Sequence, residues 1–315
     1  MKNHFLSTTD NYHRHELDSL FWEITLSVML EDPRSLCRGI LKKPDSFGNL
    51  LFDFLVTVIP MNRIRRILEI GGGYGYLMRD FLKRNSALCA TMIDLSPYLL
   101  ARQRETLREF PVQFLQGDFF DVDESVLSNA DLAILNEVVG DFPAACEVPR
   151  DMLREVPDPD DPLIQEVLRV YKSYEIALPS KERFTVNLGA IKALEKLCFA
   201  QIPYIYISEH SCEARIPKRM TELMDLAATG DPERIRLHGH DEYSIRFSDL
   251  ERVAATFGYS SRRGQYLDFI EPVIEGQVEF ILRLGASKID RHEIIRQFIE
   301  DLVKYEYLIL SLPAQ

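Results

Sequence analysis

The sequence has few cysteines, and none of them belongs to a recognisable motif. They are scattered along the 315 residues, at Cys37, Cys89, Cys146, Cys198 and Cys212. The absence of a Cys-x-x-Cys pair argues against a disulfide framework and against a zinc knuckle. Reduced thiols in a cytoplasm fit this usage better. The first residues, MKNHFLSTTDNYHRHEL, contain no apolar run of the kind that indicates a signal peptide.

Long apolar runs and an excess of positive charge are also missing. The longest apolar stretch, residues 50–61, is interrupted by Asp53 and is too short to cross a bilayer. The formal net charge of −12 argues against a general affinity for nucleic acid, whose phosphates attract Lys and Arg. We therefore expect neither a membrane nor a nucleic acid as partner, whereas the acidity would suit a cationic substrate.

Several catalytic motifs are absent as well. The chain contains neither a G-x-S-x-G elbow nor a Walker loop. His238 and His240 precede two acids, but this run lacks a third convincing metal ligand. His13 and His15 are weaker candidates still. The sequence therefore predicts no metal site.

Residues 1–62 predict a helical segment. A first helix is expected from the helical spacing of Leu17, Leu20, Phe21, Ile24 and Val28. A second helix is expected over residues 47–59, ending at Pro60. Both helices are expected to pack on the main domain, and neither carries an evident catalytic residue.

Residues 63–315 alternate strands with helices. Strands are expected at residues 67–70, 90–93, 112–115, 132–135, 204–208, 265–270 and 305–310. This alternation predicts an α/β, Rossmann-like fold, with a mostly parallel seven-stranded sheet and helices on both faces. Two irregular stretches, about 142–183 and 209–246, predict insertions or lids rather than sheet. Ser96 and Pro97 predict the N-cap and the first residue of one helix. Ser248 and Glu251 predict a capping box at the start of a later helix.

Glycines crowd the turn after the first expected strand. The run EIGGGYG (residues 69–75) differs from the dinucleotide fingerprint G-x-G-x-x-G because Tyr76 stands where the third glycine would be. The spacing of Gly71, Gly73 and Gly75 suits a ligand without a pyrophosphate, such as S-adenosylmethionine, which the backbone can approach closely. Glu69 is expected to hold the ammonium group of that ligand, directly or through water. The simpler interpretation is a tight turn without a ligand.

Acids also follow the next two expected strands. Asp94 closes the second strand, where an acid accepts hydrogen bonds from both ribose hydroxyls. Asp118 and Phe119 follow the third strand, where they are expected to bond the adenine amino group and to cover its ring. The alternative for Asp118 is that it only caps a turn.

The order of these motifs resembles the class I S-adenosylmethionine-dependent methyltransferases, and in particular the MidA-like family. That family includes the mitochondrial complex I assembly methyltransferase, which modifies arginine in a protein. The resemblance rests on IGGGYGYLM (70–78), LSP (95–97), LNE through DFP (135–143), FSDL (247–250), residues 276–285 and YLIL (307–310). It implies S-adenosylmethionine as the cofactor and S-adenosylhomocysteine as its product. It adds Leu95 and Asn136 to the expected cofactor-binding residues.

The residues after the fourth and fifth strands are expected to face the methyl acceptor. Glu137 is the first candidate to orient a cationic or NH-bearing acceptor and to remove its proton, and Asp141 is the second. An acidic helix N-terminus is the competing interpretation for both. His210 is a third candidate, against a structural role. Residues 208–211 read SEHS where the family usually has Asp-Tyr-Gly, so the acceptor is less well defined than the cofactor.

The sequence thus predicts a methyltransferase that acts on a nitrogen or oxygen of a protein or small-molecule acceptor. The missing Asp-Tyr-Gly motivates an alternative, a non-catalytic assembly or regulatory protein that binds S-adenosylmethionine. Tyr76 disfavours an NAD-dependent oxidoreductase. The net charge and the lack of an aromatic residue after Asn136 disfavour nucleic-acid methylation, because flipped bases need a stacking partner. The identity of the acceptor and the oligomeric state stay open.

Overall fold

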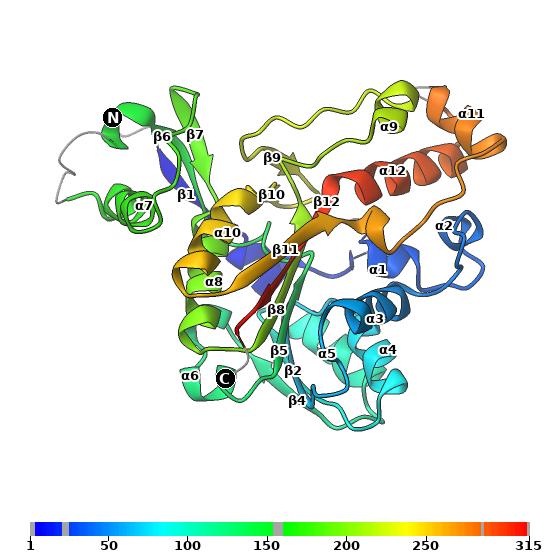
Figure 1. Ribbon diagram of the computed structural model, residues 1–315, viewed down its shortest axis with the longest axis horizontal. Coiled ribbons are helices and arrows are strands. Elements are labelled where there is room, and N and C mark those ends of the chain that lie inside the picture. The colour runs from blue at the N-terminus through cyan, green and yellow to red at the C-terminus, as the bar shows by residue number, and fades with distance from the viewer. Residues whose placement is uncertain (1–3, 21–24, 154–159, 285–286, 314–315) are drawn as a thin grey trace.

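A seven-stranded sheet forms the centre of the computed structural model, which describes residues 4–20, 25–153, 160–284 and 287–313 (Figure 1). Its strands are β2 (Arg66–Ile70), β3 (Cys89–Asp94), β4 (Val112–Gln116), β5 (Leu132–Asn136), β8 (Tyr204–His210), β11 (Ser260–Gln265) and β12 (Tyr305–Ser311). Only β12 runs against its neighbours, pairing antiparallel with both β8 and β11. The predicted Rossmann-like, mostly parallel seven-stranded sheet is confirmed.

The strands lie in the order β11-β12-β8-β5-β2-β3-β4. From β2, the chain builds β3 and β4 in one direction and then returns to add β5 and β8 on the other side. The last strand of the chain, β12, is inserted between β8 and β11, which departs from the simple doubly wound order. In open sheets of this kind a ligand binds beyond the carboxyl ends of the strands, where the order reverses. That point lies between β2 and β5.

Side chains alternate between the two faces of the sheet, as the two-residue period of a strand requires. Ile67, Leu132 and Ile134 belong to one buried apolar cluster, while Leu68 and Ala133 belong to another. The first cluster includes residues of α3 (Phe47–Val58), α4 (Tyr76–Arg84) and α12 (Asp290–Lys304). The second includes residues of α6 (Glu124–Leu127), α8 (Leu188–Phe199) and α10 (Phe247–Thr256). Figure 1 shows α8 and α10 on one side of the sheet and α3 and α4 on the other.

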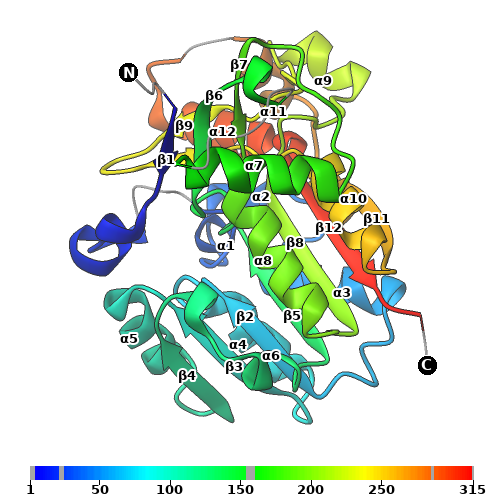
Figure 2. The ribbon, with the colours of Figure 1, turned by 90° about the vertical axis from the view of Figure 1, so that its left-hand side faces the viewer.

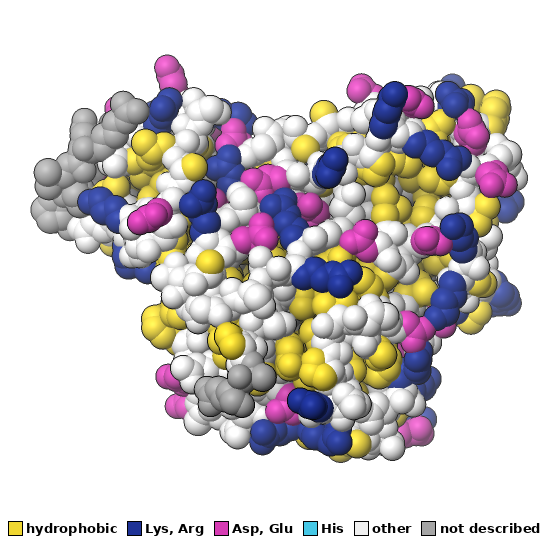
Figure 3. Space-filling model, in the orientation of Figure 1, with side chains coloured by type: hydrophobic (Ala, Val, Ile, Leu, Met, Phe, Trp, Pro, Cys, Tyr) yellow, Lys and Arg dark blue, Asp and Glu magenta, His cyan; other side chains and the backbone are white. Residues whose placement is uncertain are grey.

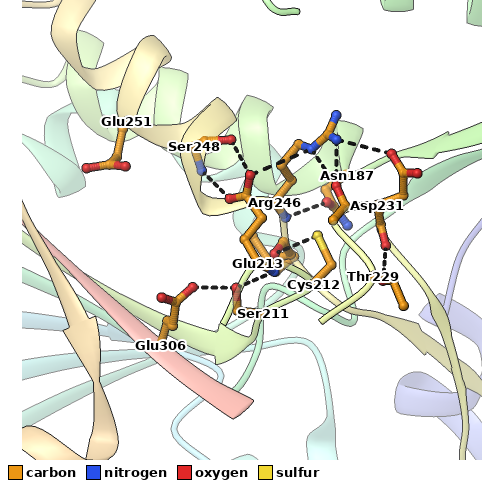
Figure 4. Close-up of polar contacts among 12 residues, drawn as sticks. Asn187, Ser211, Cys212, Glu213, Thr229, Asp231, Arg246, Ser248, Glu251 and Glu306 are labelled. Carbon is orange, nitrogen blue, oxygen red and sulfur yellow. Dashed lines mark hydrogen bonds and ion pairs between the residues drawn. The ribbon is translucent and has the colours of Figure 1, made fainter. Parts of the chain in front are cut away.

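Two helix starts were predicted from the sequence, and one prediction is wrong. The N-cap at Ser96 is confirmed, because its hydroxyl accepts the backbone N–H of Leu99 at the start of α5 (Pro97–Thr106). The capping box at Ser248 is not formed, because α10 already begins at Phe247. Instead, Glu213 of a distant loop accepts both the backbone N–H (2.9 Å) and the hydroxyl (2.7 Å) of Ser248 (Figure 4).

The N-terminal segment is less helical than predicted. Residues 17–19 have no regular secondary structure and α1 covers only Leu26–Met29, so the single helix expected from Leu17 to Val28 is wrong. Phe21 and Ile24, which contributed to that prediction, lie outside the described residues. The other short elements are β1 (Phe5–Ser7), the π-helical turn η1 (Tyr12–Glu16) and α2 (Leu36–Gly39). The predicted helix that ends before Pro60 is confirmed as α3.

The two irregular stretches contain more sheet than predicted. Strand β6 (Ala144–Pro149) pairs antiparallel with β1 and with β7 (Arg183–Val186), and Figure 2 shows β1 alongside β6. The second stretch contains the hairpin of β9 (Arg234–Arg236) and β10 (Asp241–Tyr243). The strand expected at 265–270 is displaced, because β11 ends at Gln265 and a 3-10 turn, η5 (Tyr266–Asp268), follows. The remaining elements are η3 (Phe119–Asp121), η4 (Arg150–Leu153), α7 (Pro162–Ser173), α9 (Lys218–Leu223) and α11 (Gln277–Arg283).

The surface carries charges of both signs. On the face shown in Figure 3, Lys and Arg side chains are interspersed with Asp and Glu, and apolar side chains gather around α9 and α11. The exposed apolar side chains of α11 include Phe280. In the described ranges of the chain, no helix combines the length and the apolar character that a membrane span needs.

Candidate functional site

A pocket lies at the carboxyl ends of the central strands, where the strand order reverses. It encloses about 1050 Å³ of empty space, part of which is open to solvent, a size that suits a small-molecule ligand. All but one of the residues predicted to bind the cofactor line this pocket: Glu69, Gly71, Gly73, Asp94, Leu95, Asp118, Phe119 and Asn136. The exception is Gly75, which is the N-cap of α4 and does not line it.

The glycine loop after β2 needs glycine for two physical reasons. Gly71 has a φ of +65°, a conformation that other residues adopt only at a cost. A Cβ atom at Gly71 would also stand 2.3 Å from Cγ2 of Val138, in the loop after β5. The loop therefore brings bare backbone against the neighbouring strand end and leaves the space above β2 open.

Glu69 is a buried acid that faces the pocket. Glu69 is only 2% exposed, and its Oε2 has no hydrogen-bond partner in the described part of the chain. Burial raises the pKa of Glu69 to about 8, and the nearby charge of Asp94 acts in the same direction. A cationic group in the pocket would relieve both effects, since it supplies the missing partner and the opposite charge.

Asp94 is held rigidly at the end of β3. Its Oδ1 accepts the backbone N–H of Ser96 (2.9 Å), and its Oδ2 accepts Nε2 of Gln103 (2.6 Å). The same Gln103 nitrogen donates to the backbone oxygen of Gly73 (3.1 Å), so it ties this acid to the glycine loop. Burial raises the pKa of Asp94 to about 6, against the bonds from Ser96 and Gln103 that lower it. A carboxylate offers about four acceptor positions, so Asp94 keeps capacity for ribose hydroxyls. Sequence reasoning missed Gln103.

Asp118 and Phe119 form the wall beyond β4. Asp118 caps η3 by accepting the backbone N–H of Phe120 (2.9 Å), as the simpler interpretation proposed. It also lines the pocket, so capping and ligand binding are compatible roles. Phe119 is 4% exposed, and its ring lies parallel to that of Phe142 with 6.4 Å between the ring centres. The two rings give this end of the pocket an apolar surface.

The side chain of Asn136 is fixed at the end of β5. Its Oδ1 accepts the hydroxyls of Ser208 (3.0 Å) and Tyr266 (3.1 Å). Its Nδ2 therefore points elsewhere and donates to Oε1 of Glu137 (3.2 Å). Ser208 belongs to the SEHS run that replaces the family's usual Asp-Tyr-Gly, so this run contributes directly to the position of Asn136.

Glu137 stands beside Asn136 in the pocket wall. It adopts the left-handed conformation, with a φ of +52°, which is rare for a residue with a side chain. Its Oε2 accepts the backbone N–H of Leu26 (3.1 Å), the first residue of α1. Burial raises the pKa of Glu137 to about 8, against the bonds from Leu26 and Asn136 that lower it. The acid is therefore held at the pocket from two sides, with a pKa close to neutral pH.

The side chain of Asp141 contacts two histidines, and the sequence did not indicate either contact. Its Oδ1 lies 2.9 Å from Nε2 of His13 and 3.4 Å from Nε2 of His240. Burial acts to raise the pKa of Asp141, but the two imidazoles hold it well below its usual range. Residues 238–242 therefore lie near two further side chains that can bind a metal, His13 of the N-terminal segment and Asp141 of the loop after β5. This corrects the argument on which the absence of a metal site was predicted.

His210 lies outside the pocket. Its Nε2 is 3.3 Å from Oδ1 of Asp301, and its ring meets the ring of Tyr305 edge to face, with 4.2 Å between the centres. It does not line the pocket. These contacts favour the structural role of His210 over its predicted part as an acceptor-site base.

The N-terminal segment, in which the sequence showed no evident catalytic residue, forms part of the pocket. Its lining residues are Thr9, Asp10, His13, Leu20, Thr25 and Ser27. The backbone N–H of Leu20 donates to the hydroxyl of Tyr74 (2.9 Å), and Thr9 Oγ1 donates to the backbone oxygen of Asp141 (2.9 Å). These partners are far apart in the sequence, so no local pattern signals them.

Comparisons with known proteins agree with this geometry. Residues 67–156 match the family model of a methyltransferase domain. A search of curated proteins finds no match. A solved structure of an uncharacterized superfamily protein from Burkholderia thailandensis is similar over 84% of this chain and 78% of its own, with 17% identity and a TM-score of 0.50.

A second member of that superfamily, also from Burkholderia thailandensis, was solved with S-adenosyl-homocysteine bound. It is 14% identical, the alignment covers 84% of this chain and 76% of that one, and the TM-score is 0.48. At such identities the structural likeness speaks for the fold alone, but the family match covers the glycine loop and the acids after β3 and β4. Residues 67–156 therefore form a methyltransferase domain, whose methyl donor is S-adenosylmethionine.

Proposed function

We propose that this methyltransferase transfers the methyl group to a nitrogen or oxygen atom of a protein or small-molecule acceptor. The observation that carries the proposal is the position of Glu137, whose carboxyl group lines the same pocket as Glu69, Asp94 and Asp118. A cofactor held by those three acids and an acceptor held by Glu137 would share one cavity. Transfer by in-line displacement at carbon depends mainly on such positioning.

Four groups of this chain fit the parts of the cofactor. Glu69, with its unpartnered buried oxygen, would hold the ammonium group. Asp94 would accept the ribose hydroxyls, and Asp118 with Phe119 would hold the adenine. The bare backbone at Gly71 leaves room for the amino acid part. When bound, S-adenosylmethionine supplies a methyl group on a positively charged sulfur.

Glu137 has the properties of a group that orients an acceptor and takes its proton. Its bonds with Asn136 and the backbone of Leu26 fix where the carboxyl lies. Its pKa of about 8 lies close to neutral pH, and a group whose pKa is near the operating pH transfers protons most effectively. The second acid, Asp141, has its Oδ1 bonded to His13, so it fits a positioning role better.

Calorimetric titration tests the cofactor part of the proposal. We expect S-adenosylhomocysteine to bind the full-length protein with one site per chain, and NAD to show no binding. Failure of S-adenosylhomocysteine to bind would remove the cofactor assignment and the activity with it.

The non-catalytic alternative is tested by methyl transfer from labelled S-adenosylmethionine to the components of a cell lysate, including proteins with methylatable arginine. We expect Glu137→Gln to lower the initial rate by about 10²–10⁴-fold, the usual contribution of a positioned acid or base. Gln keeps an oxygen that can accept the N–H of Leu26, so the affinity for S-adenosylhomocysteine should be unchanged. The matched control is Glu124→Gln, on the exposed surface of α6. Absence of any transfer by the wild-type chain would support the assembly or regulatory alternative.

A further inference from the structure

Three groups of the metal-ligand type meet at the wall of the pocket. His13 comes from η1, Asp141 from the loop after β5, and His240 from the turn between β9 and β10. One donor atom of each lies within 4.8 Å of the donor atoms of the other two. Glu242 adds a fourth group, because its Oε1 is 3.4 Å from Nε2 of His240. We call these residues the His13–Asp141–His240 cluster, with Glu242 beside it.

The separations within the cluster match those between neighbouring ligands of one ion. Oδ1 of Asp141 lies 2.9 Å from Nε2 of His13 and 3.4 Å from Nε2 of His240. Ligands at about 2.1 Å from an ion stand about 3.0–3.5 Å apart when they are adjacent in octahedral or tetrahedral geometry. Two imidazoles and a carboxylate are a donor set that suits first-row transition metals.

His240 gives independent support for a ligand at this place. Its side chain is 2% exposed, yet its Nδ1 has no hydrogen-bond partner among the described residues, and its Nε2 meets Asp141 and Glu242 only as ion pairs at 3.4 Å. A buried polar group without such a partner is costly. The ring is held in place by the ring of Tyr12, which stacks on it with 4.2 Å between the centres. A Cβ at the neighbouring Gly239 would stand 2.7 Å from the Tyr12 ring, so the backbone there is also closely fitted.

We propose that His13, Asp141 and His240 bind a divalent first-row transition-metal ion, with Glu242 in reach as a further donor. His13 and Asp141 also line the pocket, so the ion would face the cavity. Three protein ligands and an open position are the arrangement of catalytic rather than structural zinc sites. The ion would also tie the N-terminal segment to the central sheet. Metal binding at this cluster does not depend on the proposed function. Only a further step, in which the ion would hold an oxygen of the methyl acceptor, rests on that function.

The competing arrangement is an ion pair of protonated imidazoles with the carboxylates. Burial lowers the pKa of His240, but Asp141 and Glu242 raise it to about 10. A metal ion must then displace protons, because only neutral imidazole coordinates. The two arrangements have the same residues and similar distances, so a binding measurement has to separate them.

The test uses the full-length protein without a polyhistidine tag, stripped of metal with a chelator and titrated calorimetrically with Zn²⁺ and, separately, with Mn²⁺. We expect one ion of at least one of these metals per chain and a rise in the melting temperature on binding. His240→Asn and His13→Asn should each weaken binding by more than the about 10–100-fold that loss of an outer-shell partner costs. His15→Asn is the matched control, since it lies on the same turn, is exposed and is not in the cluster.

Titration of each variant with S-adenosylhomocysteine shows whether it is folded and separates this inference from the proposed function. Absence of metal binding by the wild-type chain, with S-adenosylhomocysteine still bound, would overturn the metal site and leave the methyltransferase assignment standing. Equal metal affinity in the wild type, His13→Asn and His240→Asn would also overturn it. If His240→Asn does not fold, His13→Asn decides, because that side chain lies on the N-terminal segment.

Discussion

The two walls of the pocket are assembled from the chain in different ways. One wall, which we call the cofactor wall after its expected ligand, comes from three successive strand ends, at residues 69–73, 94–95 and 117–120. The other wall, which we call the acceptor wall after the proposed function, combines residues 136–142 after β5 with six residues of the N-terminal segment: Thr9, Asp10, His13, Leu20, Thr25 and Ser27. Contacts in that second wall join residues more than a hundred positions apart, as between His13 and Asp141.

This difference shows what a short motif can encode. In the cofactor wall, each strand sets the direction of the turn that follows it, and that turn sets the position of the acid or glycine it contains. In the acceptor wall, each side chain is placed by a segment that arrives from elsewhere, such as the N–H of Leu26 on Glu137. The effects of substitutions in the two walls should therefore differ in both size and kind.

The largest expected effect is that of Gly71→Ala on stability. A positive φ costs a residue with a side chain about 1–3 kcal/mol, and the added Cβ would stand 2.3 Å from Val138, which adds about 1–3 kcal/mol of overpacking. We expect the free energy of unfolding to fall by about 3 kcal/mol or more. Denaturant titration measures it.

The matched control is Gly230→Ala, in the second irregular stretch. Gly230 has a φ of +75°, but its added Cβ would meet no described atom within 4 Å. It should lose only the conformational part, about 1–3 kcal/mol. Equal losses at the two glycines would mean that Val138 yields easily and that the glycine loop is not tightly built.

The next effect is that of Asp94→Asn on cofactor affinity. The amide keeps one oxygen for the N–H of Ser96 but loses the charge that strengthens bonds from ribose hydroxyls. Bonds to charged groups contribute about 1.5–3 kcal/mol, so we expect S-adenosylhomocysteine to bind about 10–100-fold more weakly by calorimetry. Asp121→Asn, exposed and outside the pocket, should change nothing. Unchanged binding of S-adenosylhomocysteine by Asp94→Asn would mean that this acid does not bind the ribose.

A separate effect concerns pH and Glu69. Burial raises the pKa of Glu69 from 4.5 to about 8, so between these values the folded chain keeps a proton that the unfolded chain releases. Glu69 therefore lowers the free energy of unfolding as pH rises from 4.5 to 8, and adds no further change above 8. Glu69→Gln should remove this component, so denaturant titrations of the two proteins should diverge across that window.

The ligand offers a second readout for the same group. Binding of an ammonium group should ionise Glu69, so near pH 7 the wild-type chain should release a proton when S-adenosylhomocysteine binds. Calorimetry in buffers of different ionisation heat detects that proton. Glu69→Gln should show none. Proton release that is equal in both proteins would place the ammonium group elsewhere.

The cofactor wall could be predicted from the sequence because its signals are local. A glycine run after an apolar strand, and acids at the ends of the next two strands, already define Gly71, Asp94 and Asp118. The fold followed for the same reason, since strand and helix alternate regularly up to Asn136. Gln103 was missed because a glutamine inside a helix carries no distinctive pattern.

The acceptor wall could not be predicted because its contacts are long-range. The spacing of Leu17 and Val28 favours one helix, but residues 17–19 have no regular secondary structure, and the N–H of Leu26 donates to the distant Glu137. His13 and His240 come together only because η1 packs on the β9–β10 turn. A lone histidine has no periodicity to reveal such a partner.

The smallest expected effects compare a local cap with a distant one. Ser96 caps α5 from the adjacent position, and Ser96→Ala should lower the free energy of unfolding by about 1 kcal/mol. Ser248→Ala should cost only about 0.5 kcal/mol, because Glu213 still accepts its backbone N–H at the start of α10. Melting curves of both variants measure the difference. A larger loss at Ser248 would mean that the distant loop depends on that hydroxyl for docking, so a long-range contact would outweigh a local one even outside the pocket.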